Sequence, residues 1–217
     1  MKVVVLGAGG IGAAVADALA LRGADVTILD MRPAGDGASQ ASAGMLAPYK
    51  EAHGDQRMLE LGTRSLALYD DFVGGLKAAT GLAIEYARSG TLEVALDSDG
   101  ARRLEHEKQT LGAAGVAADL LDVVSLRQWD PSVTPDGVAG LLTRVHGFVG
   151  VSSLVRAMMH RARFSGAVFE SPMEAASVES LRDGVEVQAG RQFYRAEMAV
   201  VAAGSWSKRV RVKHVAA

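Results

Sequence analysis

The first thirty residues combine short apolar runs and glycines in a pattern that predicts a strand, a turn, a helix and a second strand. Val3–Leu6 is an unbroken apolar run, as in a strand that is buried on both faces. A helix is expected between this strand and Gly23, and Arg22 and Gly23 give it a basic last turn and a C′ glycine. A second apolar strand over 25–29 ends at Asp30. On the helix, the apolar positions at helical spacing are Ile11, Val15, Ala18 and Leu19.

The middle of the chain changes its pattern twice. Apolar residues at helical spacing predict a long helix over 55–80, and we expect these to be core positions: Met58, Leu61, Leu68, Tyr69, Phe72 and Leu76. Residues 89–96 then alternate like a half-exposed strand, 97–112 form a charged helix, and 138–142 form a further strand. We therefore predict an inserted subdomain over 83–143.

The last third of the chain predicts a return to the first sheet. Ser152 is the expected N-cap of a helix whose inward positions are Leu154, Val155, Met158, Met159 and Ala162. A strand over 167–170 follows in a βαβ crossover, and three short strands over 175–195 form an antiparallel meander. A last buried strand is expected over 198–202. The basic segment 208–214 is expected to be a frayed terminus, with an edge strand or a nucleic-acid contact as alternatives.

Glycine spacing adds a chemical prediction to the opening unit. Gly7, Gly9 and Gly12 have the G-x-G-x-x-G spacing, and Asp30 follows 18 residues after Gly12. In such a unit the glycines allow a sharp turn, a close approach of a pyrophosphate and close helix packing, while the acid binds a ribose. The pattern therefore predicts an adenine-dinucleotide site. A turn that binds another anion is one alternative, and a secretory signal is disfavoured because glycines and an aspartate interrupt the apolar stretch.

Composition argues against several kinds of partner and site. A net charge of −2 does not favour a nucleic-acid or membrane partner, and the apolar run 3–16 is too short to span a bilayer. With no cysteine, the chain can form neither disulfides nor thiolate metal sites, which fits a reducing cytoplasm. The five histidines show no zinc-binding spacing and there is no G-x-S-x-G motif, so no metal is expected. His146 and His160 are expected to be structural.

A loop of small residues over 34–46 follows Asp30. Small side chains let a backbone approach a flat ligand, and Ser39 and Ser42 add hydroxyl groups that could reach phosphate or ribityl oxygens. A plain connector explains this loop equally well when it is considered alone.

Four segments together resemble one family: the opening unit with Asp30-Met31-Arg32, the GASQASAGMLAP loop, the HGFVGVSSLVRAMMHRA segment and the AVVAAGSWS strand end. The chain is similar to the FAD-dependent D-amino acid oxidase and glycine oxidase family over nearly its whole length to about Ser207. The resemblance implies an α/β fold of the glutathione-reductase type, with a Rossmann-like parallel sheet and a β-meander. It also implies a discontinuous FAD-binding domain (1–82 and 144–207), a partial substrate subdomain (83–143) and a basic tail (208–217).

By resemblance, FAD is the expected cofactor. The glycine turn would hold the pyrophosphate, Asp30 the adenosine ribose, and Met45 would lie at the flavin ring, while Met173 would meet the adenine through its backbone. The full set of residues expected at the cofactor is Gly7, Gly9, Gly10, Ile11, Gly12, Asp30, Met31, Arg32, Ala38, Ser39, Ala43, Gly44, Met45, Met173, Ala202, Ala203 and Gly204. Gln40 departs from the Ser or Thr often found there, and the family's usual proline after Val149 is absent.

The implied activity is the oxidation of glycine or a small amino acid or amine, with dioxygen reduced to hydrogen peroxide. The family's later half carries the substrate-binding arginine and pocket aromatics, and nothing in 208–217 matches its next segment. We therefore expect a truncated, frame-altered or split member, whose partners include substrate, dioxygen and a homo-oligomer or complementing C-terminal chain. A nicotinamide dehydrogenase and a non-catalytic FAD-binding remnant are the alternatives.

Overall fold

The computed structural model describes residues 1–52 and 54–213, which divide into two compact units. Unit 1 comprises Met1–Ala43, Asp71–Glu85 and Gly150–Ala217, and unit 2 comprises Gly44–Asp70 and Tyr86–Val149. The assignment of an FAD-binding domain and an inserted substrate subdomain to particular residue ranges stays a prediction.

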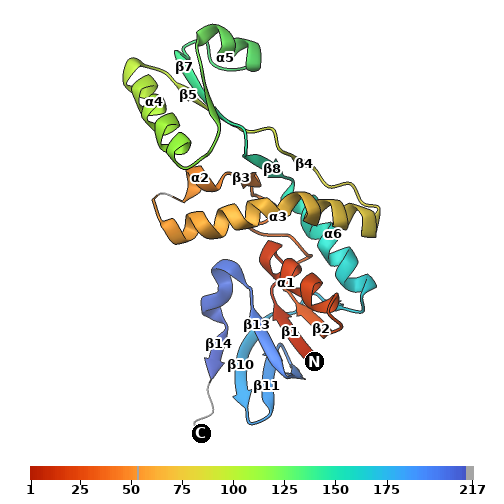
Figure 1. Ribbon diagram of the computed structural model, residues 1–217. Helices are drawn as coiled ribbons and strands as arrows, with labels where there is room; N and C mark the ends of the chain where they lie inside the picture. The colour runs from red at the N-terminus through yellow and green to blue at the C-terminus, as the bar shows by residue number, and fades with distance from the viewer. Residues whose placement is uncertain (53, 214–217) are drawn as a thin grey trace. The chain divides into compact units, whose positions relative to one another are not determined.

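Unit 1 is built on a four-stranded parallel sheet with the order β13-β1-β2-β9 (Figure 1). The strands are β1 (Lys2–Leu6), β2 (Asp25–Leu29), β9 (Val168–Glu170) and β13 (Met198–Val201). The predicted apolar runs are the buried centre of this sheet, since Val3, Val4 and Val5 have no exposed surface. β13 is less buried than expected, with Met198 47% and Val201 38% exposed, because it lies at the edge of the sheet.

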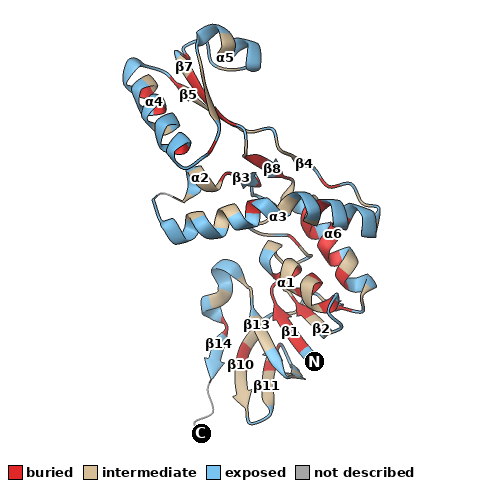
Figure 2. Cartoon of the chain, viewed as in Figure 1, coloured by how far each residue is buried: buried red, intermediate tan, exposed pale blue. Residues whose placement is uncertain are grey.

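Helices α1 (Gly10–Ala20) and α6 (Val151–Phe164) pack against each other in unit 1. The expected inward face of α6 is confirmed, since its five predicted positions are all buried, as the red face of α6 in Figure 2 shows. Its N-cap is Gly150 rather than Ser152, which lies inside the first turn. The predicted face of α1 is wrong. Ile11 is 75% exposed, and the buried positions are Gly12, Ala13, Ala16, Asp17 and Ala20.

The reason for this face of α1 is close packing. Small residues on the buried side let the helix backbone approach its neighbours, which larger apolar side chains would prevent. Asp17 lies on the same buried side and is paired with Arg161 of α6. Arg161 Nε donates to Asp17 Oδ1 over 2.9 Å and Nη2 to Oδ2 over 2.6 Å. Because these hydrogen bonds favour the charged guanidinium, Asp17 raises the pKa of Arg161.

An antiparallel meander of β10 (Ala175–Leu181), β11 (Gly184–Ala189) and β12 (Gln192–Ala196) completes unit 1, as predicted. The expected frayed terminus is wrong for part of the tail. The 3₁₀ helix η1 (Gly204–Arg209) leads into β14 (Arg211–Lys213), which pairs in parallel with β10. Backbone pairing and an ion pair between Lys213 and Glu179 hold this edge strand. His214 and the residues after it lie outside the described residues.

The long helix α3 (Gln56–Thr80) has the predicted extent, and its buried face was predicted only in part. Leu76 is buried as predicted, and Tyr69 and Phe72 are half-buried, whereas Met58, Leu61 and Leu68 are 56–67% exposed. Leu66 and Val73 are buried although they were not among the expected core positions. Periodicity alone does not show which apolar positions of a helix are buried.

Unit 2 contains two small sheets. β5 (Thr91–Ala95), β7 (Ala139–Thr143) and β6 (Ala118–Leu121) form one antiparallel sheet, which α4 (Ser98–Ala113) covers and α5 (Val123–Trp129) adjoins. β3 (Met45–Leu46), β8 (Gly147–Val149) and β4 (Tyr86–Ala87) form the other. Lys50, in the short helix α2 (Pro48–Glu51), forms ion pairs with Glu93 and Glu107 and so ties α2 to β5 and α4. β4, β6 and β8 were not predicted, because they are short and lack a clear alternation.

His146 is the buried polar residue at the turn that precedes β8. Its side chain is stacked on the ring of Tyr49, and its Nδ1 lies 2.7 Å from Thr91 Oγ1. The Nε2 atom has no hydrogen-bond partner among the described residues. Burial, followed by the nearby positive charge of Arg88, lowers the pKa of His146 from 6.5 to about 4. The geometry supports the structural role predicted for this histidine.

A pH dependence of stability follows from this burial. Between pH 6.5 and pH 4 the unfolded chain binds a proton at His146 that the folded chain does not bind, so stability is present above pH 6.5 and falls as the pH falls. We expect the free energy of unfolding of unit 2 to fall by about 2 kcal/mol between pH 7 and pH 5 through protonation of His146 alone. His146→Phe, which keeps an aromatic ring next to Tyr49, should remove this loss. Urea unfolding in a Trp206→Phe background measures it, because Trp129 of unit 2 is then the only tryptophan.

The control for this experiment is His106→Gln. His106 is exposed on α4, so its replacement should leave the pH dependence as it is in the parent chain. If His146→Phe and the parent chain lost the same stability between pH 7 and pH 5, the pH effect assigned to His146 would be wrong.

Candidate cofactor-binding site

The glycine turn lies at the carboxyl end of β1, where the backbone segments approach too closely for side chains. Gly7 has φ +110°, and a Cβ there would overlap the carbonyl group of Ala202. A Cβ on Gly12 would overlap the carbonyl oxygen of Gly7. The spacing of the glycines thus has the steric cause that the sequence predicts, and it brings the predicted cofactor residue Ala202 against Gly7.

The N-terminus of α1 faces the loop that follows β2. Gly9 is the N-cap and has no side chain to satisfy the first turn. The Ser39 hydroxyl oxygen instead accepts the Gly10 N–H over 2.9 Å, and the Gly35 N–H donates to the Ala8 carbonyl over 2.9 Å. The small-residue loop is therefore held against the glycine turn. This leaves the positive end of the α1 dipole beside backbone rather than beside bulky side chains, which suits an anion such as a pyrophosphate.

Asp30 joins three segments at the carboxyl edge of the sheet. Its Oδ2 accepts the Ala8 N–H over 2.7 Å, and its Oδ1 accepts the Arg32 N–H over 2.9 Å. Its carbonyl oxygen accepts the Met173 N–H over 2.8 Å. Each carboxylate oxygen retains a lone pair that can accept a ribose hydroxyl. Asp30, the glycine turn and Met173 are therefore brought together, as the sequence predicts for an adenosine site.

The remaining predicted residues of unit 1 lie around this edge. Ala203 and Gly204 follow β13 and begin η1, and the Ala202 N–H donates to the Leu6 carbonyl over 2.8 Å. Met31 is 55% exposed, and Ala38 and Ala43 are exposed in the loop. Ile11 is exposed in the first turn of α1, where backbone N–H groups have no partner within the helix itself.

Gly44 and Met45 belong to unit 2. Gly44 has φ +67°, and its carbonyl oxygen accepts the Val149 N–H over 2.9 Å. Met45 opens β3, pairs with Phe148 and is 48% exposed. Beside it lies a small pocket of about 140 Å³ that Leu66 and Tyr69 of α3 also line. The predicted cofactor residues are thus divided between the two units.

Sequence reasoning missed three residues of this arrangement. Ala8 supplies a backbone N–H to Asp30, Gly35 anchors the loop, and Trp206 lies in η1 with the Arg32 guanidinium 4.2 Å from its ring centroid. Backbone groups such as those of Ala8 and Gly35 leave no signal in side-chain patterns. For Trp206 the sequence did offer a signal, which is the position of this tryptophan directly after Gly204-Ser205.

Comparison with known proteins shows to which family this chain belongs. The family model described as "FAD dependent oxidoreductase" (DAO) matches residues 2–216. The chain belongs to this family. The match runs beyond Ser207 and includes the tail, so the expectation that nothing in 208–217 fits the family is wrong. FAD is the cofactor of the family, and the fold is that of its FAD-binding Rossmann-like domain.

Several relatives are similar over nearly all of this chain. A bifunctional protein ThiO/ThiG from a Nostoc species is 32% identical over 96% of the chain, and a glycine oxidase from Geobacillus kaustophilus is 27% identical over 96%. A crystal structure of glycine oxidase from Bacillus cereus superposes with a TM-score of 0.90 at 27% identity over 96% of the chain. The chain spans 31%, 55% and 56% of these three proteins, respectively.

Two further observations bear on the sequence predictions. Within 1–52 and 54–213, no helix is both long and apolar enough to cross a membrane. Over the same residues, no group of three or more histidine, aspartate or glutamate side chains is placed to hold a metal ion. His53 lies outside the described residues.

Proposed function

We propose that this chain binds FAD and serves an oxidase that removes the amino group of glycine or of another small amino acid or amine. The observation that carries the proposal is the convergence of Gly7, Gly12 and Asp30 with the N-terminus of α1 at one sheet edge. The names of two relatives, both glycine oxidases, support the amino-acid substrate. A resemblance in sequence and fold is the basis for extending that activity to this chain.

The chain's own residues fit the adenine half of FAD. The N-terminus of α1, with Gly9 and Gly10, would hold the pyrophosphate, since the dipole and the N–H groups of its first turn favour a negative charge. The Gly10 N–H donates to Ser39, so the pyrophosphate would share this N–H with the Ser39 hydroxyl oxygen or replace it. Asp30 would accept hydrogen bonds from the adenosine ribose. The Met173 N–H already donates to Asp30, so an adenine at this position would meet the Met173 carbonyl instead.

The flavin half is assigned to Gly44 and Met45 by resemblance. The chemistry that FAD would supply here is the removal of a hydride equivalent from the substrate Cα and the delivery of two electrons to dioxygen. The overall reaction consumes one amino acid, one dioxygen and one water, and it yields a 2-oxo acid, ammonia and hydrogen peroxide. Met45 carries no group that could act as a base, so the role we assign to it is to form an apolar surface beside the ring. We assign no catalytic side chain.

A second candidate is an FAD-binding protein that is inactive without further polypeptide. The fact that favours it is the length of the relatives, of which this chain spans between 31% and 56% in the three proteins described above. Under this alternative the same residues bind FAD, but substrate binding requires groups that are supplied elsewhere.

The test of the proposed function combines two measurements on the purified chain supplied with FAD. Retained flavin absorbance after gel filtration reports binding, and hydrogen peroxide release with glycine or sarcosine reports turnover. Flavin with peroxide supports the oxidase, and flavin without peroxide supports the binding-only alternative. Oxidation of the amine that depends on an added nicotinamide dinucleotide, with no flavin retained, would overturn both in favour of a dehydrogenase.

A further inference from the structure

The indole ring of Trp206 lies against the side chain of Arg32. The Arg32 guanidinium carbon is 4.2 Å from the ring centroid, which is a close cation–π distance. Trp206 comes from η1, directly after β13, and Arg32 comes from the loop after β2. Residues 174 positions apart in the sequence are therefore joined at the carboxyl edge of the unit 1 sheet.

Arg32 is held on more than one side. Its backbone N–H donates to the Asp30 carboxylate over 2.9 Å. A Cβ built on Gly37 would lie 3.7 Å from one Arg32 guanidinium nitrogen, so the small-residue loop lies next to the same side chain. The guanidinium therefore lies near both the loop at Gly37 and the ring of Trp206, and its backbone is fixed to the acid predicted to bind the ribose.

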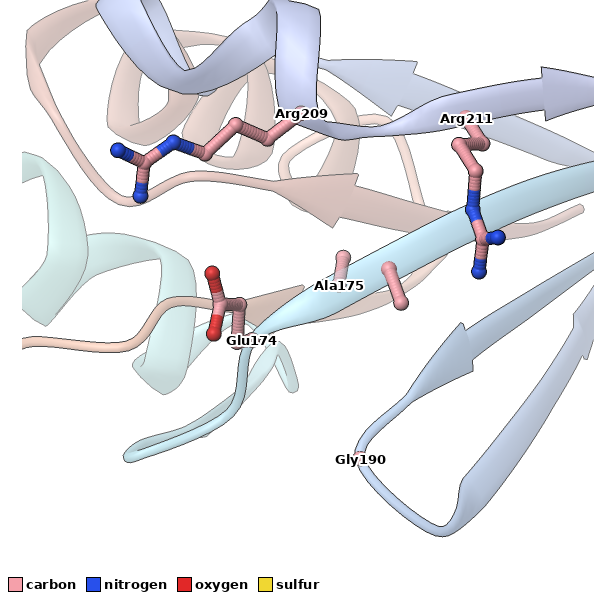
Figure 3. Close-up of a pocket in the computed structure, with 6 residues that line it drawn as sticks. Glu174, Ala175, Gly190, Arg209 and Arg211 are labelled. Atoms are coloured by element: carbon pink, nitrogen blue, oxygen red, sulfur yellow. The ribbon is translucent and has the colours of Figure 1, made fainter.

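The other end of η1 approaches the segment after Met173. Arg209, Glu174 and Ala175 line a pocket of about 370 Å³. Figure 3 shows the side chains of Arg209 and Glu174 toward one side of this pocket and that of Arg211 toward the other, with Gly190 in a turn below them. η1 thus contributes one side chain to Arg32 and another to the surface that follows Met173.

We propose that Trp206 is a positioning residue for the adenosine end of the FAD site, where its ring holds the Arg32 guanidinium at the sheet edge that carries Asp30. This inference rests on the proposed function, since it assumes that the site binds the ADP half of FAD. A free arginine side chain has many rotamers, and its charge would be spread over them. The stack on Trp206 confines the charge to the edge where the diphosphate and ribose are expected to lie.

The test is a calorimetric titration of the whole chain with ADP, in the parent chain and in four variants. Trp206→Leu should weaken ADP binding about tenfold, which lies between the values for an exposed and a desolvated cation–π contact, since Trp206 is 38% exposed. Trp206→Phe keeps a ring and should stay within about threefold of the parent chain. Arg32→Gln should weaken binding at least as much as Trp206→Leu. The double variant should bind no more weakly than Arg32→Gln alone, because Trp206 acts through Arg32.

Trp129→Leu is the matched control. It removes a similar stack, between Trp129 and Arg144 in unit 2, and should leave ADP affinity unchanged. The thermal unfolding midpoint of each variant without ligand shows whether folding is retained. Unchanged ADP affinity in a folded Trp206→Leu chain, or additive losses in the double variant, would overturn the positioning role while the proposed function stands. A parent chain that does not bind ADP would overturn both.

Discussion

Gly12→Ala is expected to destabilise unit 1 by about 3 kcal/mol and to abolish FAD binding. The reason is steric, because the added Cβ would overlap the Gly7 carbonyl oxygen and would also lie 3.5 Å from the Ala202 Cβ. Both contacts belong to the turn that the cofactor is expected to occupy, so α1 would have to move away from β1. Urea unfolding followed by Trp206 fluorescence gives the stability, and retained flavin absorbance gives the binding.

The control is Gly10→Ala, two positions earlier in the same turn. A Cβ on Gly10 would lie 3.7 Å from the Ser39 hydroxyl oxygen, which is an ordinary contact, and alanine favours a helix over glycine. This variant should be at least as stable as the parent chain. Equal stabilities for Gly12→Ala and the parent chain would show that the close packing of α1 against β1 is not as described.

Arg161→Met is expected to destabilise unit 1 by about 3–5 kcal/mol. It would leave the Asp17 carboxylate buried without its partner, since Asp17 is 1% exposed and both of its oxygens accept hydrogen bonds from Arg161. Asp17→Ala should cost less, because the Arg161 side chain is 15% exposed and can turn its charge toward water. Urea unfolding of both variants measures the difference.

The surface pair Arg195–Glu186 provides the comparison for this experiment. Its Nε–Oε2 distance is 2.8 Å, similar to the buried pair, but the Arg195 side chain is 78% exposed. Arg195→Ala should therefore cost less than about 1 kcal/mol. Comparable losses for Arg161→Met and Arg195→Ala would contradict the importance assigned to burial of the Asp17–Arg161 pair.

Much of unit 1 could be predicted because its signals are local. The Val3–Leu6 run and the glycine spacing each have one steric interpretation, and the α6 face follows a clear helical period. The face of α1 was mispredicted and that of α3 was predicted only in part, because the packing partner, and not the period, decides which apolar positions are buried. For α1 the partner requires small residues, so Ile11 is displaced to the surface.

In the candidate site, too, features with a local sequence signal were predictable, whereas contacts between distant segments were not. Gly7, Gly12 and Asp30 were predictable because their spacing reflects the backbone geometry of the turn. The Ala8 N–H that binds Asp30 and the stack of Trp206 on Arg32 depend on contacts across the sheet edge, which no local pattern encodes. For the edge strand β14, which was only an alternative to a frayed terminus, the reason is similar, since a short basic segment becomes a strand only when β10 offers it an open edge.

The glycine turn and Asp30 are proposed to form an FAD site in this chain. Equilibrium dialysis of the purified chain against FAD, with ADP and a nicotinamide dinucleotide as competitors, measures this binding directly. We expect the chain to bind one FAD, ADP to displace it and the nicotinamide dinucleotide to compete weakly. A folded chain that retains no FAD, or that binds the nicotinamide dinucleotide in preference, would contradict this proposal.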